Sequence, residues 1–408
     1  MSIKTKNIDF TFENAVTYVA FVCGLFVLLP FKLKPLTVFI FFVLSLFSII
    51  KDRNRAKIKI KTVLIYSAFF IIYAISLLYS ENMQKGFTIL GRCIPLLIIP
   101  VAYSFLTFET RVQFNQVFRK TFIVAASVYS LLIFVYLFHL GYFGHKHDLN
   151  YCYSFITYEF WGLNEHPIYI SIYFSITLFF ILIEGFKSKI INFILFLILI
   201  FGLLILARKG VIVSFFILSS VLLFLKKDKK QISKMAIVFI SLFVLSLSVS
   251  EIRNRFLEIF DTNNIVNNKE TSSGIRYILW NTSEKLIQKS DYLGYGIGDV
   301  QEVLSKQLAV DGYAVLSKEN YNAHNQFLQI GLASGVVGIC MYLFSLIYFI
   351  RTFIKRKNAE AIVFFLFFIF VFLFESVLER QNGIIIYSFI TCMFIYSLEF
   401  DKAPKNAT

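Results

Sequence analysis

A short polar sequence in front of a long apolar segment contains the side chain best suited to acid–base chemistry. Residues 321–338 read YNAHNQFLQIGLASGVVG, so His324 stands between Asn322 and Asn325. Carboxamides beside an imidazole at a membrane boundary can hold it in one tautomer and aim it at a substrate, as a general base requires. The alternative is a solvated helix start with Asn322 as its N-cap. We take His324 as the candidate base and expect Asn322 or Asn325 to orient it.

Two arginines from separate parts of the chain are candidates for binding an anion. Arg208 lies in the sequence ARKG between two apolar runs, and Arg276 lies one helical turn before Trp280. A guanidinium offers a fork of N–H donors that fits phosphate oxygens better than an ammonium group does. Two such forks at the level of lipid head groups suit a pyrophosphate. The alternative for each arginine is a charge that simply rests at the membrane surface.

Six other polar residues could join the same site, namely Arg92, His166, Tyr169, Glu375, Glu379 and Arg380. Arg92 lies inside an apolar span, where a guanidinium either faces a wet cavity or extends to the membrane surface. Glu375 and Glu379 are one helical turn apart and repel each other unless a cation such as Arg380 lies between them. We expect a structural ion pair there, and we expect His166 at the outer membrane surface.

The chain shows no pattern typical of a metal site. The segment 142–166 contains His145, His147, Asp148 and His166, but their spacing does not place them on one helical face. The five cysteines form no CxxC pair, and there is no DxD pair to hold a metal for a nucleotide-sugar donor. We expect no metal and no cofactor.

The composition is that of a membrane protein that crosses the bilayer several times. Of the 408 residues 58% are hydrophobic and only 16% are charged, with a mean hydropathy of +0.72. The net charge of +15 comes from short basic clusters between apolar runs, where the positive-inside rule places them. A nucleic-acid partner is therefore not indicated.

Twelve apolar runs are long enough to span a membrane. They lie near 14–31, 33–50, 62–80, 86–107, 121–141, 167–186, 189–207, 210–225, 234–251, 321–350, 360–378 and 382–399. The segments on the side of the two termini contain 24 of the 40 Lys and Arg residues, so we expect both termini in the cytoplasm. The first run lacks a small-residue cleavage site and is taken as a retained span.

The fold class expected is all-α, with one integral membrane domain over 1–408 and a large outward loop at 252–320 between spans nine and ten. Within this loop 261–273 is rich in Asn, and an apolar stripe at helical spacing follows. The stripe predicts an amphipathic helix on the outer membrane surface. The glycines of 294–298 predict a turn that packs the loop against the bundle.

Taken together, these motifs resemble the O-antigen ligase and O-antigen polymerase superfamily of bacterial inner membranes. The matching motifs are His166-Pro167-x-Tyr169, Ala207-Arg208-Lys209-Gly210, Arg276-x-x-x-Trp280, Gly294-Tyr295-Gly296-Ile297-Gly298, His324-Asn325-x-x-Leu328, Gly335-x-x-Gly338 and Glu375 to Gly383. They cover roughly residues 160–385, whereas the first five spans match only as apolar spans.

The resemblance implies a metal-independent glycosyltransferase of GT-C type with its active site on the periplasmic face. The donor would be a glycan linked to undecaprenyl diphosphate, held at its pyrophosphate by Arg208 and Arg276. His324 would activate the acceptor hydroxyl, and the anomeric centre would be inverted. The acceptor could be lipid A core, a second lipid-linked glycan or a protein, and the sequence does not choose among them.

Two other classes of function are compatible with a polytopic membrane protein. A multi-pass transporter of an anionic or lipid-linked substrate would use the same arginines, but such transporters commonly contain an internal repeat. Residues 1–205 and 206–408 show no repeat of each other, because the long loop and the His-Asn motif occur only once. A membrane scaffold without chemistry would leave the clustered polar residues unexplained.

Overall fold

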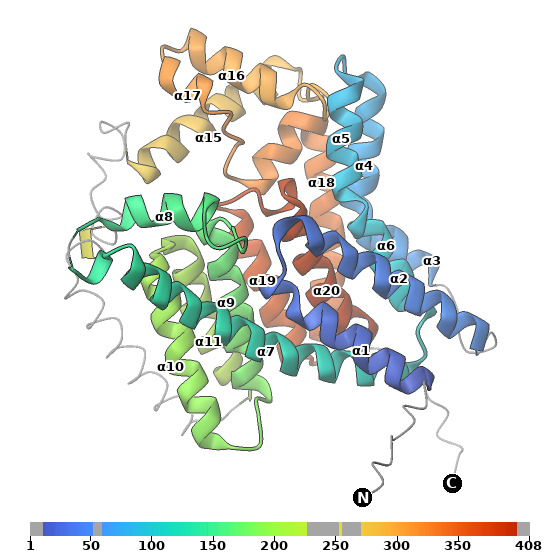
Figure 1. Ribbon diagram of the computed structural model, residues 1–408. Helices are drawn as coiled ribbons and strands as arrows, with labels where there is room; N and C mark the ends of the chain where they lie inside the picture. Colours follow the sequence, from blue (N-terminus) through green and yellow to red (C-terminus); the bar gives the residue numbers. More distant parts are fainter. Residues whose placement is uncertain (1–10, 52–58, 145, 227–252, 255–270, 398–408) are drawn as a thin grey trace, which may run out of the picture.

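The protein is described by a computed structural model at residues 11–51, 59–144, 146–226, 253–254 and 271–397 (Figure 1). All regular structure in these ranges is helical. Several helices begin at a Ser, Thr, Asp or Asn whose side chain accepts a hydrogen bond from a backbone N–H of the first turn, for example Thr107, Asp148 and Asn325. The structure is therefore the all-α membrane protein that the composition predicted.

The described residues of the first half of the chain form ten α-helices with short 3₁₀ segments between them. They are α1 (Phe12–Gly24), η1 (Leu25–Leu28), η2 (Phe31–Leu33), α2 (Lys34–Lys51), α3 (Ile60–Tyr66), α4 (Ala68–Ser76), η3 (Leu77–Tyr79), α5 (Met83–Cys93), α6 (Pro95–Phe105), α7 (Phe108–His139), η4 (Tyr142–Gly144), α8 (Leu149–Tyr158), α9 (Pro167–Ile183) and α10 (Lys189–Leu206).

The second half begins with the partner of α10 in a tight hairpin and ends with a buried helix. Its elements are α11 (Lys209–Lys226), α15 (Ser272–Lys289), α16 (Val300–Val310), α17 (Ala314–Lys318), α18 (Gln326–Lys355), α19 (Ala359–Phe372), η5 (Val377–Glu379) and α20 (Gln381–Ser397). Figure 1 shows α15, α16 and α17 as a cap over one end of the bundle.

Within the described residues, six helices are long and apolar enough to cross a membrane, or seven if the pair α3–α4, bent by 60°, counts as one span. Shorter apolar helices lie at Phe12–Leu28, Pro167–Ile183 and Ala359–Phe372. Every expected span coincides with a helix or helix pair, except 234–251, which lies outside the described residues. A polytopic membrane protein is therefore supported, and the number twelve stays a prediction.

Aromatic side chains join the two halves of the bundle. The ring of Phe41 on α2 lies 5.0 Å from that of Tyr103 on α6, 4.6 Å from that of Phe114 on α7 and 5.2 Å from that of Phe389 on α20. Burial from water does not drive helices together within a lipid phase, so such close packing has to hold them. The bundle thereby forms a fixed base for the cap.

The glycine-rich segment 294–298 attaches the cap to a break in α18. The N–H groups of Tyr295 and Gly296 donate to the carbonyls of Leu332 and Ala333 at 2.8 and 2.9 Å. Gly335 interrupts α18 with a φ of +64°, and a Cβ there would meet the backbone of Tyr292 and Leu293, just before the glycine-rich segment. A Cβ at Gly294 would in turn lie 2.6 Å from the backbone nitrogen of Gly335. The two glycine motifs therefore fit each other, and the segment packs the loop against the bundle as expected.

The amphipathic helix expected in the loop is α15, but its apolar face is covered by protein. Ile278, Leu279, Leu286 and Ile287 are buried, and α15 packs against α16 and α18. This corrects the expectation that the face rests on the membrane surface. Amphipathic spacing shows that one face needs an apolar partner, and it does not distinguish lipid from another helix. The Asn-rich part of the loop, 261–270, lies outside the described residues.

Candidate active site

A cavity of about 370 Å³ lies between α11, α15 and the end of α19. Its charged wall contains Arg208, Arg276 and Glu375, which come from three distant parts of the chain. Its apolar wall is formed by Ile168, Val211, Val213, Val371 and Phe374. A cavity with a charged end and an apolar remainder suits an amphiphilic ligand.

The hairpin turn between α10 and α11 brings Arg208 to this cavity. Ala207 closes α10 with a φ of +49°, a left-handed conformation that residues other than glycine rarely adopt. The guanidinium carbon of Arg208 lies 4.7 Å from the centre of the Tyr153 ring, a cation–π contact. A Cβ at Gly210 would lie 2.8 Å from the Phe374 ring, so glycine permits α11 to approach that segment.

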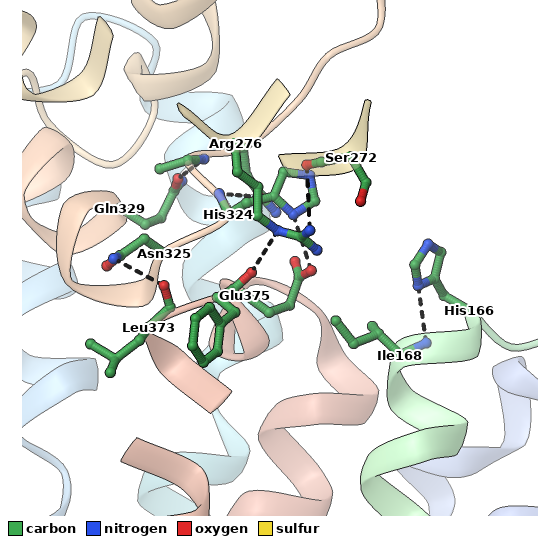
Figure 2. Close-up of polar contacts among 12 residues, drawn as sticks. His166, Ile168, Ser272, Arg276, His324, Asn325, Gln329, Leu373 and Glu375 are labelled. Atoms are coloured by element: carbon green, nitrogen blue, oxygen red, sulfur yellow. Dashed lines mark hydrogen bonds and ion pairs between the residues drawn. The ribbon is translucent and has the colours of Figure 1, made fainter. Parts of the chain in front are cut away.

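Helix α15 contributes two side chains, one turn apart, to the same region. Arg276 donates from Nε to the carbonyl of Phe374 at 3.1 Å and from Nη1 to the carbonyl of Ser272 at 3.4 Å (Figure 2). Trp280 donates from Nε1 to the carbonyl of His324 at 3.2 Å. The Arg-x-x-x-Trp spacing thus places a cation in the cavity and anchors the polypeptide next to it.

His324 is held by contacts to its backbone and its ring. It has a φ of +44°, its N–H donates to Asn322 Oδ1 at 2.9 Å, and its Nδ1 lies 3.0 Å from Glu375 Oε2. Asn325 caps α18 and donates from Nδ2 to the carbonyl of Leu373. Both asparagines therefore position the backbone, whereas the ring is oriented by Glu375 and not by Asn322 or Asn325 as we expected.

The charge of Glu375 is stabilised by the cations around it. Burial by itself would raise the pKa of this carboxyl, but the charge and hydrogen bond of His324, followed by the charges of Arg276 and His166, lower it to about 2. Glu375 is therefore ionised at neutral pH. An ionised carboxylate accepts hydrogen bonds only, so the proton of the His324 ring lies on Nδ1 and leaves Nε2 as an acceptor.

His166 lies opposite Glu375 at the start of α9 (Figure 2). Its Nδ1 accepts from the N–H of Ile168 at 3.4 Å, so its ring proton lies on Nε2. Burial, followed by the charge of Arg208, lowers its pKa to about 3, although Glu375 opposes the shift. His166 is therefore a neutral donor at the edge of the site.

The other expected site residues belong to a second cavity of about 240 Å³. Arg92, Glu379 and Arg380 line it together, and the guanidinium carbon of Arg380 lies 6.0 Å from the centre of the buried Tyr169 ring. Glu379 accepts a hydrogen bond from Tyr73 at 2.6 Å. The expected ion pair between Glu375, Glu379 and a shared cation is therefore not formed, because the two carboxylates face different cavities.

The histidines of the segment 142–166 have structural contacts. His147 stacks on Tyr151 with ring centres 3.9 Å apart, and Asp148 caps α8 by accepting from the N–H of Tyr151. His145 lies outside the described residues. In the part of the chain that the structure describes, no three His, Cys, Asp or Glu side chains are grouped to hold a metal ion. Metal independence stays a prediction.

One buried polar cluster was missed by the sequence reasoning. Lys34 Nζ lies 2.7 Å from Glu165 Oε2, and the same carboxylate accepts from Tyr173, Asn382 and the N–H of His166. It ties α2 and α20 to the residue before His166. Lys34 stands in a short basic sequence at a span boundary, which reads as a solvated loop, so no local signal indicated its burial.

Comparison with known proteins agrees with this geometry. Residues 193–343, somewhat more than a third of the chain, match the model of a family described as O-antigen ligase. This segment contains Arg208, Arg276 and His324.

An uncharacterized protein of Haemophilus influenzae is 27% identical to the chain over 233 residues. The match covers 52% of this chain and 58% of that protein, so the chain spans little more than half the length of this relative. The family match and the helical membrane fold support the resemblance of the chain to the O-antigen ligase and polymerase superfamily.

Proposed function

We propose that this protein transfers a glycan from an undecaprenyl-diphosphate-linked donor to an acceptor hydroxyl. The observation that carries the proposal is a single cavity in which two guanidiniums and an apolar wall meet a carboxylate bonded to a histidine. Each component corresponds to one requirement of the reaction: a site for the leaving group, a site for its lipid and a base.

The cavity wall fits the chemistry of a prenyl diphosphate. Arg208 and Arg276 can each offer two parallel N–H donors to pyrophosphate oxygens. Charge-assisted hydrogen bonds of this kind are stronger than hydrogen bonds between neutral groups. The first isoprene units would lie along Val211, Val213 and Val371. The donor would then be held at the junction between lipid and head group.

The proton of the acceptor hydroxyl would pass to His324. Because Glu375 accepts from Nδ1–H, Nε2 is free of a proton and can act as the general base. In the transfer, a bond forms between the acceptor oxygen and the anomeric carbon while the bond from that carbon to the pyrophosphate oxygen breaks. The electron pair leaves with undecaprenyl diphosphate, the proton remains on His324, and direct displacement inverts the anomeric carbon.

The location of the reaction follows from the charge pattern. Lys and Arg gather at the segments assigned to the cytoplasmic side, whereas the cap formed by α15, α16 and α17 belongs to the loop assigned to the other side. The active site would therefore face the periplasm of a bacterial inner membrane, with both termini cytoplasmic and a GT-C-like arrangement of helices. The acceptor would be lipid A core, a second lipid-linked glycan or a protein.

Replacing each arginine by lysine tests the donor site. Purified protein in nanodiscs would be assayed for binding and transfer with a lipid-linked glycan as donor, comparing Arg208→Lys and Arg276→Lys with Arg351→Lys at the other end of α18. A lysine keeps the charge but loses the fork, so we expect transfer to fall by about 10- to 100-fold in the first two variants only. Full activity in both cavity variants would overturn the assignment.

A further inference from the structure

The second cavity is lined by cations that the proposed donor site does not use. Lys85 and Arg92 reach it from α5, and Arg380 reaches it from the segment before α20. Glu379 is the one carboxylate among the residues that line it. Three cations and one carboxylate leave a formal charge of +2 in a space of about 240 Å³.

This cavity adjoins the backbone around His324. Asn322 lines it and accepts the hydrogen bond from the His324 N–H at 2.9 Å, and Gln329 lines it and accepts from the N–H of Ala323 at 3.0 Å. Glu375, which lines the first cavity, bonds to the His324 ring. Figure 2 shows Gln329 and Glu375 approaching the histidine from different directions.

The two cavities are separate because their lining residues do not overlap. Glu375 and Glu379 are four residues apart, yet the first lines one cavity and the second lines the other. His324 contacts one lining residue of each cavity: its ring contacts Glu375 of the first cavity, and its backbone N–H donates to Asn322 of the second.

The carboxylate of the second cavity does not cancel the cations. Burial raises the pKa of Glu379, an effect opposed by the hydrogen bond from Tyr73 and by the charge of Arg92. A raised pKa disfavours the negative form, and the hydrogen bond from Tyr73 occupies one oxygen of the carboxyl group. The cavity thus stays positive in either protonation state of Glu379.

We propose that the second cavity binds an anionic group, a phosphate monoester or a carboxylate, carried by the acceptor sugar. The inference rests on the proposed function and specifies its acceptor. In a direct displacement the nucleophile attacks the face of the sugar opposite the leaving group, so acceptor and pyrophosphate need separate sites on either side of the reacting carbon. An anionic anchor beside His324 would bring the acceptor hydroxyl to the base from the side away from Arg208 and Arg276.

Calorimetric titration with glucose 6-phosphate tests the site directly. The full-length protein would be placed in nanodiscs of phosphatidylcholine and saturated with undecaprenyl diphosphate, so that the first cavity is filled. We expect one molecule of glucose 6-phosphate to bind per protein and unmodified glucose to bind at least tenfold more weakly. Loss of glucose 6-phosphate binding when undecaprenyl diphosphate is present would mean one shared site and would overturn the proposal.

Variants of the second cavity show where the anion binds. Arg92→Gln and Lys85→Gln should each weaken glucose 6-phosphate binding by about tenfold, because each removes one charge-assisted hydrogen bond. Lys318→Gln, on an exposed side chain of α17 that lines neither cavity, should leave it unchanged. Unchanged binding in both cavity variants, with thermal unfolding midpoints near that of the parent, would overturn the assignment.

Two further measurements complete the test. The first distinguishes an acceptor sugar from a lipid head group as the source of the anion, and the second tests the proposed donor site independently of the second cavity. If phosphatidylglycerol in the nanodisc displaces glucose 6-phosphate, the cavity binds a lipid head group and the acceptor assignment is wrong. The donor site is tested on its own by undecaprenyl diphosphate binding to Arg276→Gln. Intact binding there would contradict the proposed function, whereas the glucose 6-phosphate result would still report on the second cavity.

Discussion

Two ion pairs of similar length differ in their surroundings. The Lys34–Glu165 pair is enclosed by protein and is called the closed pair, whereas the His324–Glu375 pair borders a cavity and is called the open pair. The Lys34–Glu165 pair is 2.7 Å long with side chains 2% and 3% exposed, and the His324–Glu375 pair is 3.0 Å long with side chains 21% and 7% exposed. In the closed pair the carboxylate accepts from several donors and contacts no ligand cavity of those described. In the open pair the carboxylate lines a cavity and its partner is a group that can exchange a proton.

The difference shows that an ion pair indicates function only when a titratable partner can reach a ligand. Both pairs join segments far apart in sequence, so both contribute to the position of the site. A closed pair of fixed charges can only hold segments in place. An open pair that contains a histidine can also accept a proton at neutral pH.

The largest effect that tests this comparison is expected from removing the open pair's base. His324→Ala should reduce transfer by about 10²- to 10⁴-fold, because a general base contributes a factor of this size, while donor binding stays nearly intact. Transfer and donor binding would be measured on the same purified samples. Near-normal turnover, or a loss of donor binding alone, would make His324 structural and move the search for the base to His166 and Glu375.

Breaking the closed pair should affect stability instead of chemistry. Lys34→Met leaves the charge of Glu165 buried without its main partner, which costs on the order of 3–5 kcal/mol of folding free energy. We expect a clearly lower thermal unfolding midpoint and a transfer rate, per folded molecule, within a few-fold of the parent.

The matched control for Lys34→Met is Lys306→Met, which breaks an exposed surface pair with Glu302. Exposed pairs contribute little to stability because solvent screens them, so its unfolding midpoint should hardly change. Equal shifts in the two variants would contradict the distinction between buried and exposed pairs.

A smaller effect, on the stability of the folded protein, is expected when the pH is lowered and the side chains around the open pair become protonated. The folded-state pKa of His166, about 3, lies below its ordinary value of 6.5, so the unfolded chain binds more protons than the folded protein between these values. Stability should therefore fall as pH falls from 6.5 towards 3. The carboxylate of Glu375, with a pKa of about 2 instead of 4.5, adds a loss that begins below pH 4.5.

The variant His166→Gln isolates the first of these two contributions. We expect its unfolding midpoint to change less than that of the parent between pH 6.5 and 4.5, and the two curves to become more nearly parallel at higher pH. The measurement is thermal unfolding across this pH range in one detergent. Parallel curves over the whole range would show that His166 is not the group responsible.

No effect at all is expected from a chelator. Removal of divalent cations should leave the transfer rate unchanged, because the proposed site neutralises the pyrophosphate with Arg208 and Arg276. A loss of activity that magnesium or manganese restores would mean that carboxylates such as Glu375 or Glu379 bind a cation during the reaction.

The sequence by itself determined the class of the protein and the residue types of its site. Apolar runs of this length are unfavourable in water, and in lipid they form helices because a helix satisfies its own backbone hydrogen bonds. The all-α membrane fold therefore follows from composition and run length. Arg208 and Arg276 could be selected because both are cations on the side expected to face outward, against the positive-inside trend, and Arg276 borders an expected amphipathic helix. His324 could be selected because it is a titratable group at the start of an apolar span. These are properties of single residues and of short stretches of chain.

Only the tertiary structure decided which of these residues meet. Helical spacing placed Glu375 and Glu379 side by side, whereas the turn after α19 sends them into different cavities and gives Glu375 to His324. The apolar face of α15 and the buried Lys34–Glu165 pair likewise acquired their partners from helices far along the chain. A local sequence pattern indicates that a side chain needs a partner. Which residue becomes that partner depends on how the whole bundle packs, because packing brings together residues that lie far apart in the sequence.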